Sequence, residues 1–123
     1  MTQEDKDLLL KDLCSRLPYG VKIELTWWVM DEGTYVNVTL EPEHIEQLLN
    51  YENYTTEIKP YLFPLSNMTE EQKKEYQYIT ERWMYDSSYS ISDSIDWLNK
   101  NHFDYRGLIP MELAIDATNL NIY

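Results

Sequence analysis

The sequence predicts an α+β fold, in which a small, mostly antiparallel sheet is covered on one face by about three helices. Residues 21–40 alternate apolar and polar side chains on either side of a turn, as in a β-hairpin. Residues 3–17, 69–85 and 91–99 carry apolar side chains at helical spacing. The 123 residues are too few for two domains of comparable size, so we expect residues 1–123 to form a single domain.

The first helix is predicted over residues 3–17, because an acidic first turn precedes apolar residues at helical spacing. Pro18 and Gly20 should end it. The apolar stripe that we expect to face the core consists of Leu10, Leu13, Cys14 and Leu17. A buried Cys14 would be inert, because burial raises the pKa of a thiol.

The hairpin is predicted from two alternating segments joined by Asp31-Glu32-Gly33, whose glycine tolerates turn geometry. In the first strand the residues expected to face the core are Val21, Ile23, Leu25, Trp27 and Val29. In the second strand, the same alternation places Val36, Val38 and Leu40 on one side. Trp28 points to the opposite face from Trp27, which makes it an interface candidate.

The middle of the chain is less regular. Pro42 suits the first position of a short helix ending near Asn50, although a third strand fits the same residues. Residues 57–65 form an extended segment. Its prolines, Pro60 and Pro64, predict an edge or irregular strand that is not central in the sheet.

Two more helices and a closing strand are expected towards the end of the chain. Thr69 and Gln72 form a capping-box pattern for a helix that runs to about Tyr85. A short third helix is marked by Ile91, Ile95 and Leu98, and a closing strand by the alternating residues Met111, Leu113 and Ile115.

Charge and cysteine content restrict the function. There are 22 acidic and 10 basic residues, a net charge of −12, which disfavours direct binding to nucleic acid or to an anionic membrane. One cysteine permits no internal disulfide, and we find neither a signal peptide nor an apolar run long enough to cross a membrane. The sequence therefore predicts a soluble, cytoplasmic protein.

Motifs for cofactor chemistry are lacking in the sequence. The three glycines form no phosphate-binding loop, and the two histidines lie in no metal-ligand motif, so we expect no cofactor, no metal and no enzymatic activity. The alternative is a small hydrolase or transferase that uses His102, Asp104 and Arg106. On extended backbone, His102 and Asp104 would share one side, where the carboxylate could orient the imidazole. The competing interpretation is structural: Phe103 and Tyr105 anchor this loop, while Asp104 and Arg106 bond to backbone groups or to each other.

The strongest functional signal is an acidic stretch without any base. No Lys or Arg occurs between Lys22 and Lys59, whereas eight acidic residues fall there. We interpret this stretch as a face that binds a basic protein partner, such as the nucleic-acid-binding surface of a host or phage protein, which the chain would then inhibit. The predicted partner-binding residues are Trp28, Asp31, Glu32, Glu41, Glu43, Glu46, Tyr51, Glu52 and Tyr54. A solvated surface that keeps the protein soluble explains the same charges, and a homo-oligomeric structural protein assembled through Trp28 is a further alternative.

Three segments carry a resemblance to a family. They are residues 8–21 (LLLKDLCSRLPYGV), 58–69 (IKPYLFPLSNMT) and 96–109 (DWLNKNHFDYRGLI), about 40 of the 123 residues. Together they resemble a family of short proteins without an assigned activity, found in gut bacterial genomes and in their phages and mobile elements. The resemblance implies an intracellular, phage-linked setting and brings no catalytic residue with it. It also implies that residues 22–57, where such relatives vary, determine the choice of partner.

Overall fold

The computed structural model describes residues 2–27, 33–50, 56–85 and 91–123. Within these ranges the chain forms four α-helices and a mixed five-stranded sheet, which confirms the α+β class. The helices are α1 (Gln3–Arg16), α2 (Pro42–Asn50), α3 (Glu70–Tyr85) and α4 (Ile91–Lys100), with 3₁₀ turns η1 (Leu17–Tyr19) and η2 (Leu65–Asn67). The strands are β1 (Lys22–Trp27), β2 (Gly33–Thr39), β3 (Thr56–Pro64), β4 (Phe103–Asp104) and β5 (Ile115–Asp116). No helix in the described ranges is long and apolar enough to cross a membrane.

Helix α1 has the predicted extent. Thr2 and Asp5 form a reciprocal capping box, with the Asp5 N–H donating to Thr2 Oγ1 (3.1 Å) and the Thr2 N–H donating to Asp5 Oδ2 (3.3 Å). Gly20 then turns the chain towards β1 with φ +67°, a backbone conformation that glycine adopts without steric cost.

The predicted burial of Cys14 is wrong, because its side chain is exposed. The buried face of α1 consists of Leu9, Asp12, Leu13 and Arg16, so the helix is rotated relative to the predicted stripe. A charged pair at i and i+4 lies on the inner face, and this displaces Cys14 to the outside.

Strands β1 and β2 form the predicted antiparallel hairpin, but its register contains a bulge. Ile23 pairs with Val38 and Leu25 with Tyr35, so two residues of β2, Val36 and Asn37, lie opposite one residue of β1. Asn37 has φ +56°, which asparagine tolerates. The extra residue shifts the alternation. Val36 is 62% exposed, and the prediction that it shares a side with Val38 and Leu40 is wrong.

Strand β3 is central, contrary to the prediction that its prolines exclude it from that position. The strand order is β2-β1-β3-β4, and β5 also pairs with β3. Pro60 forms the last pair of the β1 ladder, and Pro64 forms the last pair of the β4 ladder. Because each proline lies where a ladder ends, its missing N–H interrupts no continuous ladder.

Residues 42–50 are helical, so the alternative of a third strand there is wrong. His44 helps to fix this helix: its Nδ1 accepts the backbone N–H of Glu41 (2.9 Å), as the glutamate of a capping box would. The extended backbone of β3 then begins at Thr56.

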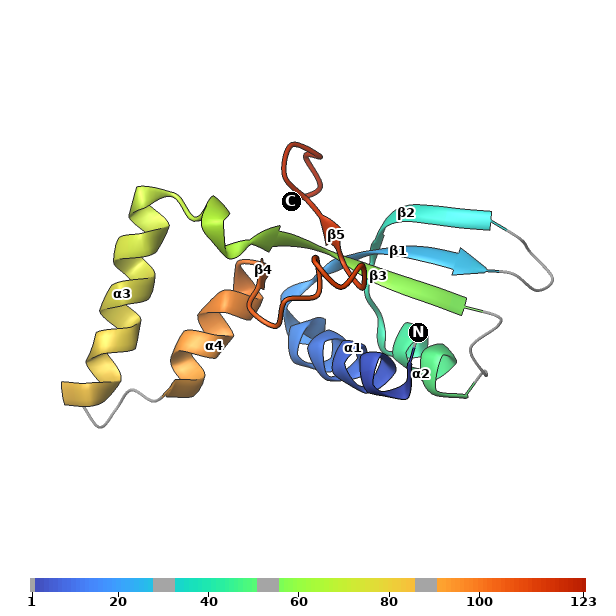
Figure 1. The fold of residues 1–123 in the computed structure, drawn as a ribbon, viewed down its shortest axis with the longest axis horizontal. Helices are drawn as coiled ribbons and strands as arrows, with labels where there is room; N and C mark the ends of the chain where they lie inside the picture. The colour runs from blue at the N-terminus through green and yellow to red at the C-terminus, as the bar shows by residue number, and fades with distance from the viewer. Residues whose placement is uncertain (1, 28–32, 51–55, 86–90) are drawn as a thin grey trace.

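Helices α1 and α2 lie on one side of the sheet, and the tail that follows β5 lies on the other side (Figure 1). Helices α3 and α4 extend beyond the end of the sheet that is opposite the connection between β1 and β2. The Thr69–Gln72 capping box is present and α3 ends at Tyr85 as predicted. However, α3 packs on α4 rather than on the sheet, so the prediction that it covers the sheet is wrong. The predicted stripe of α4 is also incorrect in part, since Ile91 is 62% exposed.

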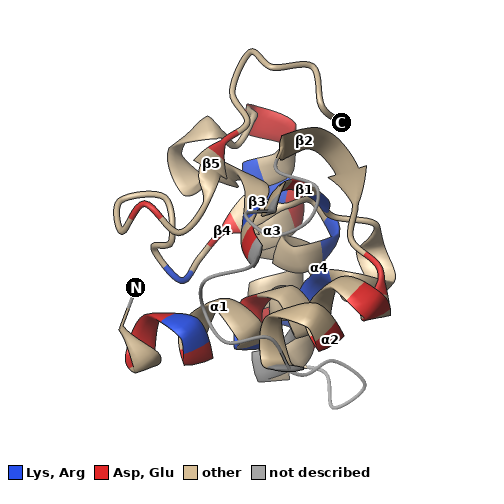
Figure 2. Ribbon diagram, turned by 90° about the vertical axis from the view of Figure 1, so that its right-hand side faces the viewer, with Lys and Arg blue, Asp and Glu red and all other residues tan. Residues whose placement is uncertain are grey.

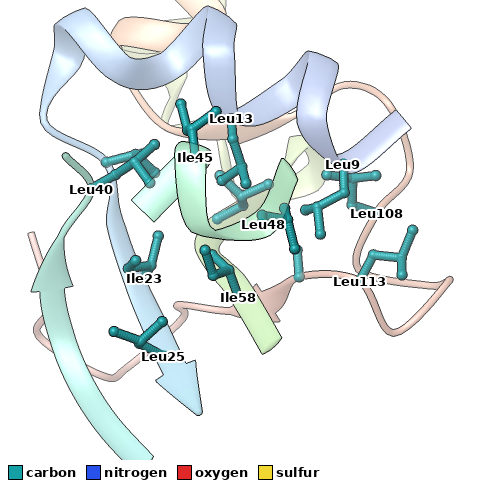
Figure 3. Packing of buried hydrophobic residues seen from close by; sticks show 13 residues of the cluster. Leu9, Leu13, Ile23, Leu25, Leu40, Ile45, Leu48, Ile58, Leu108 and Leu113 are labelled. Atoms are coloured by element: carbon teal, nitrogen blue, oxygen red, sulfur yellow. The ribbon is translucent and has the colours of Figure 1, made fainter. Parts of the chain in front are cut away.

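The predicted closing strand is shortened to Ile115–Asp116, and Met111 is exposed. Residues 108–113 form a compact turn instead, in which the Leu113 N–H donates to the Leu108 carbonyl (3.0 Å). The turn brings Leu108 and Leu113 into the main core. That core joins α1 and α2 to β1 and β3 (Figure 3). Its other members include Leu9, Leu13, Ile23, Leu25, Ile45, Leu48, Ile58 and Leu62.

Candidate functional site

A buried cluster of charged side chains connects α1 to the loop after β4. Asp12 and Arg16 are both fully buried, and Arg16 Nε donates to Asp12 Oδ2 (2.8 Å). Arg106 Nη1 donates to the other oxygen, Asp12 Oδ1 (2.7 Å). Two guanidinium groups therefore neutralise one carboxylate that has no contact with solvent, an arrangement that is costly to break from either side.

An aromatic ring lies against both guanidinium groups of this cluster. The Tyr105 ring centroid is 5.3 Å from Arg16 Cζ and 4.6 Å from Arg106 Cζ, within the range of cation–π attraction. The Tyr105 hydroxyl donates to Asn99 Oδ1 (2.9 Å), and Arg16 Nη2 donates to the Phe103 carbonyl (2.6 Å). The cluster thus ties α1, the end of α4 and β4 together.

The structure does not assemble the alternative catalytic group. Asp104 accepts the backbone N–H groups of Leu108 and Ile109, both at 2.9 Å, and so holds the 108–113 turn. Arg106 binds Asp12, not Asp104. The expectation that His102 and Asp104 lie on extended backbone is wrong, because His102 has φ +63°. The structural interpretation of this loop accounts for these contacts, except that Arg106 pairs with α1.

His102 is held by Tyr123. The two rings stack with centroids 3.7 Å apart and an interplanar angle of 11°. Burial and the nearby charge of Arg16 lower the pKa of His102 to about 4. The Tyr123 hydroxyl accepts the Lys22 N–H (2.8 Å) and donates to the Tyr61 carbonyl (2.7 Å), and burial raises its pKa. His102 is therefore neutral at pH 7.

The lowered pKa of His102 predicts acid sensitivity. The unfolded chain protonates this imidazole near pH 6.5 and the folded chain only near pH 4, so the free energy of unfolding should fall as the pH drops through this interval. We expect a loss of about 1–2 kcal/mol, since partial solvent access reduces the effect of the full shift. Urea denaturation of the wild type and His102→Asn at pH 7 and 4 measures it. Parallel losses in both proteins would contradict the assignment.

The described residues of the acidic stretch divide between two layers of the fold. Glu24 and Glu57 alternate with buried residues of β1 and β3, which places them on the sheet face opposite α1 and α2. There Lys59 Nζ pairs with Glu57 Oε1 (3.3 Å). Glu41, Glu43 and Glu46 lie on the exposed surface of α2 and its N-terminal approach, on the other layer. The interpretation of the whole stretch as one acidic face is therefore wrong.

The predicted partner-binding residues are only partly described. Figure 2 shows acidic residues on α2. Glu43 and Glu46 of this helix and Glu41, which directly precedes it, are exposed, and we call these three the α2 acidic surface. The remaining members of the prediction lie outside the described residues: Trp28, Asp31, Glu32, Tyr51, Glu52 and Tyr54. In the described ranges, no group of three or more His, Cys, Asp or Glu side chains is placed to hold a metal ion.

The sequence interpretation missed the Asp12–Arg16–Arg106 cluster. Asp12 and Arg16 are four residues apart, and Asp12 follows Leu9 by three residues, so both charges fall on the same helical face as Leu9 and Leu13. Opposite charges on an apolar face were the available signal. Arg106, 90 residues beyond Arg16 in the chain, offers no local pattern that would have revealed its role.

Comparison with known proteins adds no relative: no family model matches the chain, and no curated protein and no solved structure matches it. The class defined by the structure is that of a small α+β fold with a buried charge cluster and an acidic helix surface.

Proposed function

We propose that this chain is a non-enzymatic protein-binding module that binds a basic partner protein through the α2 acidic surface. The supporting observation is that Glu41, Glu43 and Glu46 are exposed and form no ion pair with the described part of the chain. Elsewhere the fold does provide partners, as Lys59 does for Glu57 and Lys73 for Glu70.

The α2 acidic surface carries like charges close together. Glu43 and Glu46 are three residues apart on one helix, a spacing at which like charges destabilise it. No Lys or Arg occurs in α2, and none lies between Lys22 and Lys59. A partner that presents lysines or arginines would relieve this repulsion and would be attracted over a distance at low salt.

Nucleic-acid-binding proteins carry basic surfaces of this kind, so we infer that the partner's own ligand is a nucleic acid. Occupation of that surface by α2 would then inhibit the partner. The phage-linked setting implied by the family resemblance agrees with such a role and remains a prediction.

The proposal predicts a captured partner that depends on salt and on α2. Affinity purification with mass spectrometry should recover a basic protein at low ionic strength and lose it at high ionic strength. Substituting Gln for Glu41, Glu43 and Glu46 should abolish capture. The matched control substitutes Gln for Glu71, Glu75 and Glu81, exposed residues of α3 that give the same change in net charge. Failure to capture a basic protein, or equal losses in both triple variants, would refute the proposal.

A further inference from the structure

The outer edge of β2 has no neighbouring strand among the described residues. β2 is the terminal strand in the order β2-β1-β3-β4, so only its β1 side is paired there. Backbone N–H and C=O groups on a free edge form a template for another extended chain.

Strand β2 also lacks the charged residues that usually protect such an edge. Its sequence, Gly33–Thr39, contains no Lys, Arg, Asp or Glu, and Figure 2 shows the strand without charge along its length. Thr34 and Asn37 are exposed, and Val36 is 62% exposed. β-Branched residues such as Thr34 and Val38 favour pairing with a further strand.

The bulge at Val36 and Asn37 limits what this edge can bind. It divides β2 into two short regular parts, Gly33–Tyr35 and Val38–Thr39, so an added strand would form few backbone hydrogen bonds. Backbone pairing alone would then be weak and unselective. A second source of affinity must determine which extended chain binds.

The α2 acidic surface provides that second source. The end of β2 leads into α2 through two residues, Leu40 and Glu41, and the Leu40 N–H donates to the Val21 carbonyl (2.9 Å), which fixes this connection. One end of a strand added beside Thr39 therefore lies two residues along the chain from Glu41, which directly precedes α2. Basic residues at that end of the added strand would meet the α2 acidic surface.

From this juxtaposition we infer that the partner contributes an extended segment that pairs antiparallel with the outer edge of β2, with Lys or Arg residues immediately before the segment. Antiparallel pairing is the commoner arrangement, and it places the start of the added strand beside the end of β2. A second copy of this chain is disfavoured as the occupant, because two molecules of net charge −12 repel each other. The inference rests on the proposed function and specifies the form of its partner.

Synthetic peptides test this geometry. The probe peptide has the sequence Lys-Lys-Arg-Thr-Val-Thr-Val, and the matched control, Thr-Val-Thr-Val-Arg-Lys-Lys, has the same composition with its charges at the other end. A third peptide carries backbone N-methyl groups in the Thr-Val part of the probe, so it keeps the charges but loses hydrogen-bond donors. We expect the probe to bind about tenfold more tightly than either of the others. Backbone amides in Gly33–Thr39 should gain protection from hydrogen exchange only with the probe.

Equal affinity for all three peptides would overturn strand addition. Two other results would do the same: no binding of the probe, or protection that appears outside β2 instead of within it. Protection of the Gly33–Thr39 amides without any peptide, in a protein whose mass in solution is twice 14.8 kDa, would also overturn it, because a second copy would then occupy the edge. These results are separable from the proposed function. Salt-dependent capture that requires Glu41, Glu43 and Glu46 can persist when strand addition fails, and the peptide result can hold when no basic partner is captured.

Discussion

Replacing Asp12 with alanine is expected to lower the free energy of unfolding by about 3–5 kcal/mol. Asp12 accepts hydrogen bonds from Arg16 and Arg106, and both Asp12 and Arg16 are inaccessible to solvent. Without the carboxylate, the Arg16 guanidinium remains buried as an unpaired charge. A loss of this size is a large part of the roughly 5–15 kcal/mol that stabilises a typical domain.

Urea denaturation followed by tryptophan fluorescence measures this loss, with Asp7→Ala on the same helix as the control. Asp7 is exposed, so its replacement should change the free energy of unfolding by no more than about 0.5 kcal/mol. If Asp12→Ala is as stable as Asp7→Ala, the buried charge cluster does not stabilise the fold.

Replacing Phe103 with alanine should be similarly damaging, with an expected loss of about 3–5 kcal/mol. Phe103 is 2% exposed, stacks on Trp97 at a centroid distance of 5.8 Å and contacts Phe63 at 6.3 Å. Phe103 and Phe63 are the strand residues of a second apolar cluster, which also contains Trp97 and Leu98 of α4 and Tyr76 and Ile79 of α3. This cluster attaches α3 and α4 to the sheet.

The Phe103 variant therefore has a specific signature. Near-ultraviolet circular dichroism from the ring environment of Trp97 should weaken along with the free energy of unfolding. Leu120→Ala is the control, because Leu120 is 48% exposed and its loss leaves no cavity. An intact Trp97 signal together with wild-type stability in Phe103→Ala would show that α3 and α4 are held by other contacts.

Local patterns in the sequence were sufficient for most of the helices and for the hairpin. Thr69 and Gln72 are three residues apart, and the capping box that they predict is formed. The alternation of Ile23 and Leu25 correctly predicted the buried side of β1. In such cases the determining interaction lies within a few residues of the pattern, so a single sequence reveals it.

The errors arose where a distant segment determines the local structure. By its local sequence, Pro60 predicts an edge strand. However, β1 pairs with β3 up to Pro60 and β5 pairs with β3 from Tyr61 onwards, and these distant partners make the strand central. Cys14 continues an apolar stripe by spacing, yet Arg106, far away in the chain, helps hold Asp12 inside and so sets the rotation of α1. Val36 is exposed because of a bulge that the alternating pattern does not reveal.

The candidate site was predictable only in part. The absence of bases around Glu41, Glu43 and Glu46 is visible in the sequence, and these residues are exposed as a binding surface requires. Their separation from Glu24 and Glu57 depends on sheet pairing and helix packing, which no local pattern encodes. The junction of the uncharged β2 edge with α2 likewise becomes apparent only in three dimensions.

The salt dependence of partner binding tests the role of α2 most directly. The association rate of the captured partner would be measured over a range of ionic strengths for the wild type, the α2 triple Gln variant and the α3 triple Gln variant. We predict that the rate falls with salt for the wild type and the α3 variant, and that the α2 variant binds slowly with little salt dependence. An α2 variant with the rate and salt dependence of the wild type would contradict a function based on this surface.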